Sequence, residues 1–205
     1  MDTPSPAELE QGYQAFQQHE QRDAMYKVAT FLVDHFWGKP AEMADGLGVL
    51  LLTWNQAHYR YGAFDFDNLE KCISSNLTLL AGYRERSILS YLPADDKPIK
   101  DLFRQFLHAL RVCEGSRKGA TSPVAVAKAL HLFAPAFFPL WDDKIARAYH
   151  CHYAYKPAEK YLTFFAKMKQ ITEALQNHVD TQGTGKTLLK LIDEYNYARY
   201  TKRWV

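Results

Sequence analysis

Apolar residues recur along most of this chain at intervals of three and four positions, the spacing that puts them on one face of an α-helix. In the clearest case, 98–113, six of them would share one face: Ile99, Leu102, Phe103, Phe106, Leu107 and Leu110. No stretch alternates strands with helices, so the pattern predicts an all-α protein of about ten helices. Besides 98–113, helices are expected over 6–19, 23–37, 49–60, 67–80, 123–133, 158–179 and 186–203.

Polar residues mark where several of these helices should begin. Ser5 is expected to cap the first helix, with Glu8 completing a capping box three residues later. Asp67 and Glu70 predict the same arrangement for a later helix. These pairs favour well-defined helix starts because each satisfies backbone amides that have no partner within the helix.

Glycines and apolar residues also predict features of the segments 23–37 and 46–60. The Gly-Leu-Gly sequence at 46–48 is expected to separate the leucine-rich segment 49–60 from the chain before it. The helix at 23–37 is expected to present one apolar stripe, made of Met25, Val28, Ala29, Leu32 and Phe36.

The most apolar stretch, 122–149, joins two helices through a turn and carries the leading candidates for chemistry. Pro123 suits the first turn of a helix because its missing N–H is not needed there. Pro135 should end that helix, and bulky apolar residues follow it. Asp142 and Asp143 come next and open the second helix. An acid held there has a fixed position and little water, so it either performs chemistry or only caps the helix.

The 205 residues are 47% hydrophobic and 14% aromatic, enough to build a core. The expected organisation is one helical domain, 1–205, whose first six residues (1–6) are disordered. An arrangement in two lobes is the alternative, one made of 1–45 with 150–205 and the other of 46–149.

Charge is unevenly distributed although the net charge is only +2. Residues 1–70 hold 4 basic and 11 acidic side chains, whereas residues 71–205 hold 21 basic and 12 acidic. A basic surface on the larger part is typical of proteins that meet a polyanion. The alternative is that these charges lie on ordinary solvated helix faces.

Neither the cysteines nor the histidines indicate a metal or disulfide framework. Cys72, Cys113 and Cys151 lack CxxC spacing, which fits a reducing compartment. The His-Cys-His sequence at 150–152 has no second ligand pair at a suitable spacing. No apolar run approaches ~18 residues and no signal peptide is visible, so we expect a cytoplasmic protein without metal or cofactor, not membrane-bound, and without an obligate protein partner.

The sequence Gly-Thr-Gly-Lys-Thr at 183–187 invites interpretation as a nucleotide phosphate loop. That pattern requires a glycine where Asp180 stands, and it should follow a strand. A nucleotide loop is therefore excluded. A helix N-terminus with Lys186 could still hold one backbone phosphate.

A second constellation, Thr-Trp-Asn-Gln at 53–56, ends the leucine-rich segment. Polar amides at such a place usually mean that the helix has reached water. The other interpretation is that Asn55 and Gln56 are presented to hydrogen-bond an unpaired base.

Together these constellations resemble the helix-hairpin-helix superfamily of DNA glycosylases, the group of endonuclease III and 8-oxoguanine glycosylase. The sequence 139–145, Pro-Leu-Trp-Asp-Asp-Lys-Ile, resembles the family's turn with its catalytic aspartate, which places Asp142 at the catalytic position and Asp143 beside it. The segment 51–56 resembles the helix end that inserts an amide into the gap left by a flipped base. The likeness covers about 45–150.

Three family features are missing. The hairpin region 119–123 lacks the second glycine. Bifunctional members carry a Schiff-base lysine where this chain has Pro123 or Val124, and Lys128 lies one turn further along. There is no four-cysteine iron–sulfur cluster. The resemblance therefore implies a monofunctional enzyme that hydrolyses the N-glycosidic bond of a modified or damaged base in duplex DNA.

The resemblance also implies roles for individual residues. Asp142 would stabilise the sugar cation and activate water, while Asn55 or Gln56 would fill the gap in the duplex. The expected base pocket consists of Trp54, Trp141, Tyr149, His131 and Lys128. The expected phosphate-binding residues are Arg117, Lys118, Gly119, Lys186 and Lys190.

Two other functions remain open. One is a DNA-binding relative that has lost the chemistry, and the other is a helical protein-interaction module in which Asp142 only caps a helix. If the chain is a glycosylase, the base is undefined: an oxidised or alkylated base would mean repair, and a hypermodified phage cytosine would mean defence.

Overall fold

The computed structural model describes residues 3–20 and 23–205, apart from the side chain of Gln182. The protein is all-α, as predicted, and within the described residues no β-strand forms. The α-helices are α1 (Pro6–His19), α2 (Ala24–His35), α3 (Pro40–Trp54), α4 (Gln56–Tyr59), α5 (Phe66–Arg84), α6 (Asp96–Ala109), α7 (Pro123–Phe133), α8 (Asp143–Ala148), α9 (Pro157–Leu175) and α10 (Leu188–Asn196). Short turns are η1 (Ile88–Ser90), η2 (Pro93–Asp95), η3 (Gln182–Thr184) and the π-helical η4 (Tyr197–Lys202).

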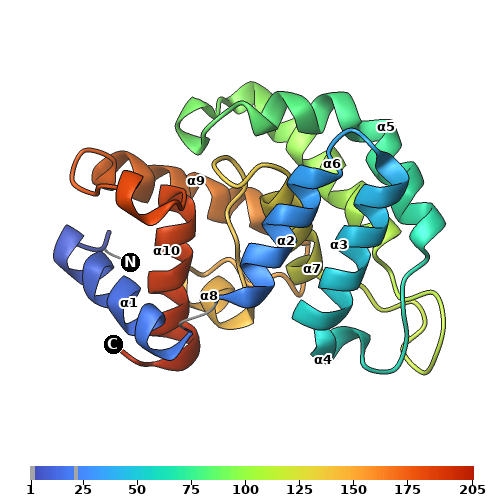
Figure 1. The fold of residues 1–205 in the computed structure, drawn as a ribbon, viewed down its shortest axis with the longest axis horizontal. Helices are drawn as coiled ribbons and strands as arrows, with labels where there is room; N and C mark the ends of the chain where they lie inside the picture. Colours follow the sequence, from blue (N-terminus) through green and yellow to red (C-terminus); the bar gives the residue numbers. More distant parts are fainter. Residues whose placement is uncertain (1–2, 21–22) are drawn as a thin grey trace.

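The two ends of the chain pack together at one end of the molecule. Helix α1 lies against α10, and α2 lies against α3, which in turn packs on α5 (Figure 1). Helix α6 contacts α5, α7 and α9. The expected lobe boundary at 45/46 falls inside α3, so one continuous helix crosses it.

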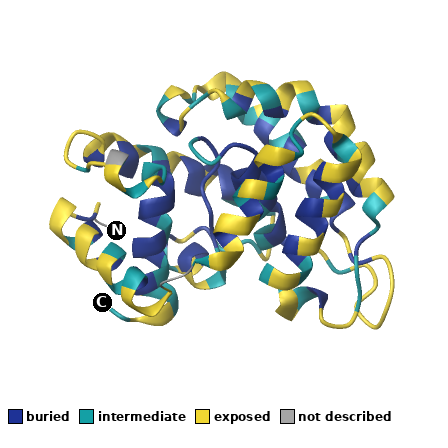
Figure 2. Ribbon diagram, viewed as in Figure 1, coloured by how far each residue is buried: buried dark blue, intermediate teal, exposed yellow. Residues whose placement is uncertain are grey.

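Helix α7 and the turn after it form the centre of the core (Figure 2). Phe133, Phe137 and Phe138 are fully buried, as is nearly all of Trp141. The Phe137 ring stacks on Tyr83 with centroids 4.6 Å apart, so α5 helps to hold the turn. Burial of several aromatic rings here contributes roughly 2 kcal/mol each. The start of α8 is consequently anchored to the buried core.

The expected break at 46–48 is wrong, because α3 runs through both glycines. Gly48 serves packing: a Cβ at this position would collide with the ring of Phe66 at the start of α5. Gly12 serves the same purpose in α1, where a Cβ would lie 2.9 Å from Cα of Tyr195 in α10. Glycine inside a helix costs about 1 kcal/mol, and the close approach of two helices offsets that cost.

Helix starts and faces agree with the sequence pattern in part. The Ser5–Glu8 capping box is confirmed. Helix α5 starts earlier than predicted, and Asp65, not Asp67, caps it. In α2 the expected stripe is wrong at Met25 and Val28, which are exposed. The buried face is shifted by one position and contains Tyr26, Ala29 and Val33.

The chain ends differ from the expected form in small ways. Residues 1–2 of the expected disordered lead lie outside the described residues; Pro4 is buried and α1 begins at Pro6. The last predicted helix, 186–203, divides into α10 and η4, and the wider π turn changes the direction of its side chains. None of the described helices is long and apolar enough to cross a bilayer.

Candidate functional site

Asp142 is the N-cap of α8, and both of its carboxylate oxygens are used. One oxygen accepts a 2.7 Å hydrogen bond from the amide of Ile145, which is the expected capping contact. The other accepts a 2.6 Å hydrogen bond from the hydroxyl of Thr201 in η4. Because a cap needs only the first bond, the second is an additional constraint that aligns the carboxylate with the C-terminal segment.

Lys128 extends from α7 toward the same place. Its ammonium donates a 2.9 Å hydrogen bond to the carbonyl of Trp54 and lies 4.5 Å from the centre of the Trp54 ring. Burial lowers the pKa of Lys128 to about 8, and the negative charges of Asp193 and Asp142 only partly oppose that shift. This lysine therefore exchanges its proton close to neutral pH.

Asp193 of α10 completes the group. Burial raises the pKa of Asp193 to about 6, although the Lys190 ammonium 3.3 Å away opposes the rise. The charges of Glu194 and Asp142 push the pKa of Asp193 further upward. Asp142, Lys128 and Asp193, here called the acid–lysine group, come from three distant segments, and the charge of Asp142 acts on the pKa values of the other two. Clusters of this kind with shifted pKa values mark functional sites.

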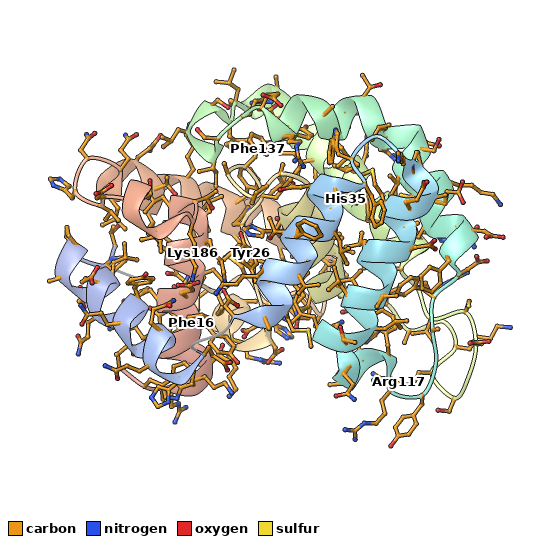
Figure 3. The ribbon with its side chains drawn as sticks, in the orientation of Figure 1. Phe16, Tyr26, His35, Arg117, Phe137 and Lys186 are labelled. Carbon is orange, nitrogen blue, oxygen red and sulfur yellow. The ribbon has the colours of Figure 1, made fainter. Side chains whose placement is uncertain are left out.

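A cavity of about 590 Å³ opens beside the acid–lysine group. Aromatic and apolar walls come from Phe16, Met25, Trp54 and Tyr197, and the charged part of its lining includes Lys190 and Asp193. Figure 3 shows Phe16 and Tyr26 near this junction of α1, α2 and α10. Lys128 and Asp142 do not line the cavity themselves. Lys128 contacts Trp54 of the wall, and the charge of Asp142 acts on Asp193.

Behind the wall, His131 is a core residue, not a pocket side chain. It is fully buried, and its two ring nitrogens lie 2.7 Å from the carbonyl of Phe138 and 3.2 Å from the hydroxyl of Tyr26. Burial lowers the pKa of His131 to about 3. The neutral ring then donates to Phe138 and accepts from Tyr26, which fixes its tautomer.

Two further residues of the expected base pocket lie in the core. Trp141 is 1% exposed and packs among Phe103, Tyr161 and Phe164. Tyr149 is also buried, with its hydroxyl donating to Asn196. Neither ring is available for stacking on a base, so both assignments are wrong. Trp54 alone among the predicted aromatic residues lines the cavity.

Lys186 and Lys190 are not free phosphate ligands. Lys190 has only 3% of its side chain exposed and lies within 4 Å of Asp23, Asp193 and Glu194. Lys186 pairs with Glu194 at 2.5 Å. Carboxylates already neutralise both ammonium groups, which contradicts the predicted phosphate contacts. The lysines instead hold α10 to the segment before α2.

The hairpin region presents basic side chains, and three of its backbone amides are already used. The amides of Lys118, Gly119 and Ala120 all donate to carbonyls of the same loop. Gly119 has φ +90°, a conformation that favours glycine. The predicted contact of Gly119 with a phosphate through its amide is therefore wrong. Arg117 and Lys118 remain exposed, with Arg117 also donating to the carbonyls of Ala57 and His58.

Asp143 points away from the acid–lysine group. Its carboxylate accepts a 2.8 Å hydrogen bond from Arg147 and lies 3.0 Å from His152. The hydrogen bond from Arg147, with a smaller contribution from His152, lowers the pKa of Asp143. This position gives it no contact with the cavity. Among the described residues no group of three or more potential ligands could hold a metal ion.

The predicted gap-filling residues lie between α3 and α4. The amide of Asn55 donates to Ser122, the N-cap of α7, so this side chain joins two parts of the fold. Gln56 is exposed and heads α4. Of the two, only Gln56 is free to enter a duplex without breaking an internal hydrogen bond.

Asp193 and Thr201 have no distinguishing mark in the sequence. Asp193 stands next to Glu194, as on many solvated helix faces, and Thr201 lies close to the C-terminus. The signal that could have identified Asp193 is its place on a mostly apolar helix, where a charge needs a partner.

Comparisons of the chain with protein-family models, with curated proteins and with solved structures each found no match. Its function must therefore be inferred from the residues of the site.

Proposed function

We propose that this protein is a monofunctional DNA glycosylase that hydrolyses the N-glycosidic bond of a modified or damaged base. The observation that carries the proposal is the acid–lysine group, a fixed carboxylate with two titratable partners beside an aromatic-walled cavity. The resemblance of 139–145 and 51–56 to helix-hairpin-helix glycosylases supports the same chemistry. Such an enzyme acts where DNA is, so we place it in the bacterial cytoplasm, at the nucleoid.

The cavity suits a base that has left the duplex. Flipping a base costs a few kcal/mol, which stacking and hydrogen bonds in a pocket must offset. Trp54 and Tyr197 offer aromatic rings, and Asp193 offers a polar contact. Its volume of about 590 Å³ lies within the ordinary range for ligand pockets and leaves room for a substituent on the base. Gln56 at the head of α4 would fill the gap in the duplex.

The proposed reaction uses Asp142 and Asp193 in different protonation states. As the bond from C1′ to the base nitrogen breaks, its electron pair stays with the base, which takes the proton of the Asp193 carboxyl. The Asp142 carboxylate stabilises the cationic sugar and accepts a proton from the water that attacks C1′. Exchange with solvent then restores both groups. The products are the free base and an abasic site.

Lys128 acts through its charge in this scheme. Its ammonium is held by the Trp54 carbonyl and ring, and it balances the negative charges of Asp142 and Asp193. A lysine nucleophile would instead form a Schiff base with the sugar. Reduction with borohydride during turnover traps such a complex, and a trapped complex would contradict the monofunctional assignment.

The test is incubation with duplexes that carry modified bases, phage genomic DNA included, followed by mild alkali. Strand breaks that require alkali and disappear in Asp142→Asn are expected. Asp193→Asn should lose most activity against neutral bases, and the residual activity should no longer fall as pH rises above about 6. Absence of breaks with every DNA in the wild-type protein would refute the proposal.

One observation favours a second candidate, a helical protein-interaction module. Met25, Val28 and Phe31 are 46%, 50% and 63% exposed along one side of α2. Exposed apolar residues grouped in this way often mark contact sites. If neither base release nor salt-dependent DNA binding occurs, this interpretation remains and Asp142 is a helix cap.

A further inference from the structure

A second surface hollow, of about 370 Å³, lies between α8 and η4. Its lining contains four basic side chains and no acidic one, with residues Lys144, Arg147, Ala148, Arg199, Tyr200 and Arg203. All four basic residues are exposed. We call this hollow the basic groove. Its charge differs from that of the cavity beside Asp193, where carboxylates neutralise the lysines.

The basic side chains of the groove keep capacity for an anion. Lys144 donates to the carbonyl of Thr201, and among the described residues neither Lys144 nor Arg203 has a carboxylate within 4 Å. Arg147 and Arg199 pair with Asp143 and Glu8 through exposed contacts. Such surface pairs are weak, so an incoming phosphate could replace the carboxylates. Two cations that have no carboxylate partner among the described residues, and two with exchangeable partners, thus face one hollow.

The groove is physically joined to the acid–lysine group. Lys144 bonds the backbone oxygen of Thr201, and the hydroxyl of the same Thr201 bonds Asp142. Asp142 is the N-cap of α8, and this helix carries Lys144 and Arg147 in its first two turns. An anion in the groove would therefore sit beside the carboxylate that is proposed to act on the sugar.

We propose that the basic groove binds backbone phosphates of duplex DNA next to the flipped nucleotide. This inference rests on the proposed function for the identity of the nucleotide, but DNA binding by the groove can be tested without catalysis. The phosphates beside an extruded sugar must lie close to the catalytic carboxylate, and the groove is the surface tied to Asp142 through Thr201. Arginine and lysine side chains are the usual phosphate ligands in such contacts.

The groove offers phosphate ligands where several of the predicted ones are already bonded. The tip amides at 118–120 are bonded within the loop, and Lys186 and Lys190 are bonded to carboxylates. A nucleic-acid backbone is favoured over an anionic membrane because the exposed apolar residues of α2, such as Val28 and Phe31, belong to a helix that does not line the groove. Membrane-surface sites typically combine cations with apolar side chains on one face.

The experiment measures affinity of the full chain for an unmodified duplex over a range of salt concentrations. The test variant is Lys144→Gln with Arg203→Gln. The matched control is Lys97→Gln with Arg104→Gln, the same change of charge on exposed positions of α6. Vesicles of phosphatidylcholine with phosphatidylglycerol are titrated in parallel. Base release from modified duplexes is scored separately.

Loss of two phosphate contacts should lower the slope of log affinity against log salt by about 1.8 and weaken binding about tenfold or more at low salt. The control should retain the wild-type slope. An unchanged slope in the groove variant, or binding to vesicles without binding to DNA, would overturn the inference. Salt-dependent binding through the groove without base release would uphold the groove and refute the glycosylase proposal, so the two failures are distinguishable.

Discussion

Asp142 and Asp143 are neighbours in sequence with different bonding partners. Asp142 bonds Thr201 and acts on the pKa values of Lys128 and Asp193. Asp143 faces outward and pairs with Arg147 and His152 at the surface. The same side chain type therefore belongs to two different chemical environments one residue apart.

The difference arises from the start of a helix. The N-cap residue has extended backbone, φ −126° and ψ −177° for Asp142, so its side chain folds back over the first turn. The next residue already has helical geometry and projects sideways to its partner four positions later. Buried aromatic residues before α8 then decide which side is the interior. When two acids stand at the start of a helix, the role of each side chain must therefore be predicted separately.

The largest contrast should appear in catalysis. Asp142→Asn keeps the N-cap, because asparagine caps as well as aspartate, but it removes the charge. We expect base release to fall by about 100-fold or more, with little change in Asp143→Asn. Single-turnover base release measures both, and thermal melting checks that both variants fold. Equal losses of base release in the two variants would show that Asp142 and Asp143 do not differ in catalysis.

The next contrast compares a buried cation near Asp193, Lys190, with the exposed Arg147 that pairs with Asp143. Lys190→Met leaves the Asp193 carboxylate without its buried lysine and leaves Glu194 with Lys186 alone, so the free energy of unfolding should fall by about 3–5 kcal/mol. Arg147→Met removes only an exposed ion pair and should leave the free energy of unfolding nearly unchanged. Urea unfolding at pH 7 compares them. A stable Lys190→Met protein would mean that the buried carboxylates take up protons instead.

A smaller contrast tests the hydrogen-bond partners of the two acids. Thr201→Val removes the bond to the second oxygen of Asp142 while keeping the shape of the side chain. A hydrogen bond to a charged group contributes about 1.5–3 kcal/mol, so base release should slow by about tenfold or more. His152→Gln, at the Asp143 side, is the matched control and should be active. Equal rates would show that Thr201 does not position the carboxylate.

The last contrast concerns pH and the buried His131. The pKa of His131 is lowered to about 3 in the folded protein, whereas the unfolded chain takes up the proton near pH 6.5. Its contribution is therefore fully present above pH 6.5 and is lost as pH falls, by about 1.4 kcal/mol per pH unit. The raised pKa of Asp193 works in the opposite direction below about pH 6.

Only a variant can separate these two contributions. His131→Gln should flatten the loss of unfolding free energy between pH 6.5 and pH 4, measured by urea unfolding relative to the wild type. Asp193→Asn should steepen it. If His131→Gln leaves the pH dependence unchanged, His131 is not neutral in the folded protein.

Local signals in the sequence predicted the helices, the Ser5 cap and the position of Asp142 at a helix start. These features depend on residues within a few positions of each other, so spacing and capping chemistry suffice. The packing role of Gly48 was missed because its reason, the ring of Phe66, lies in another helix. Periodicity alone also misplaced the buried face of α2 by one residue.

The cavity was harder to predict because its walls come from both ends of the chain. Asp193 is significant only because burial, Lys190 and Asp142 act on it together, and none of these is visible in the local sequence. Trp141 was assigned to a base pocket because it adjoins Asp142, but its ring is buried in the core. Lys186 and Lys190 were predicted to bind phosphate because the sequence does not show that Glu194 lies beside both ammonium groups.

The central claim is that Asp142 acts on a glycosidic bond. The most direct measurement is mass spectrometry of the free bases released from modified duplexes by the wild-type protein and by Asp142→Asn. We predict one modified base released by the wild type, in equal amount to new abasic sites, and almost none by the variant. Intact DNA with every modified duplex, or equal release by both proteins, would contradict the claim.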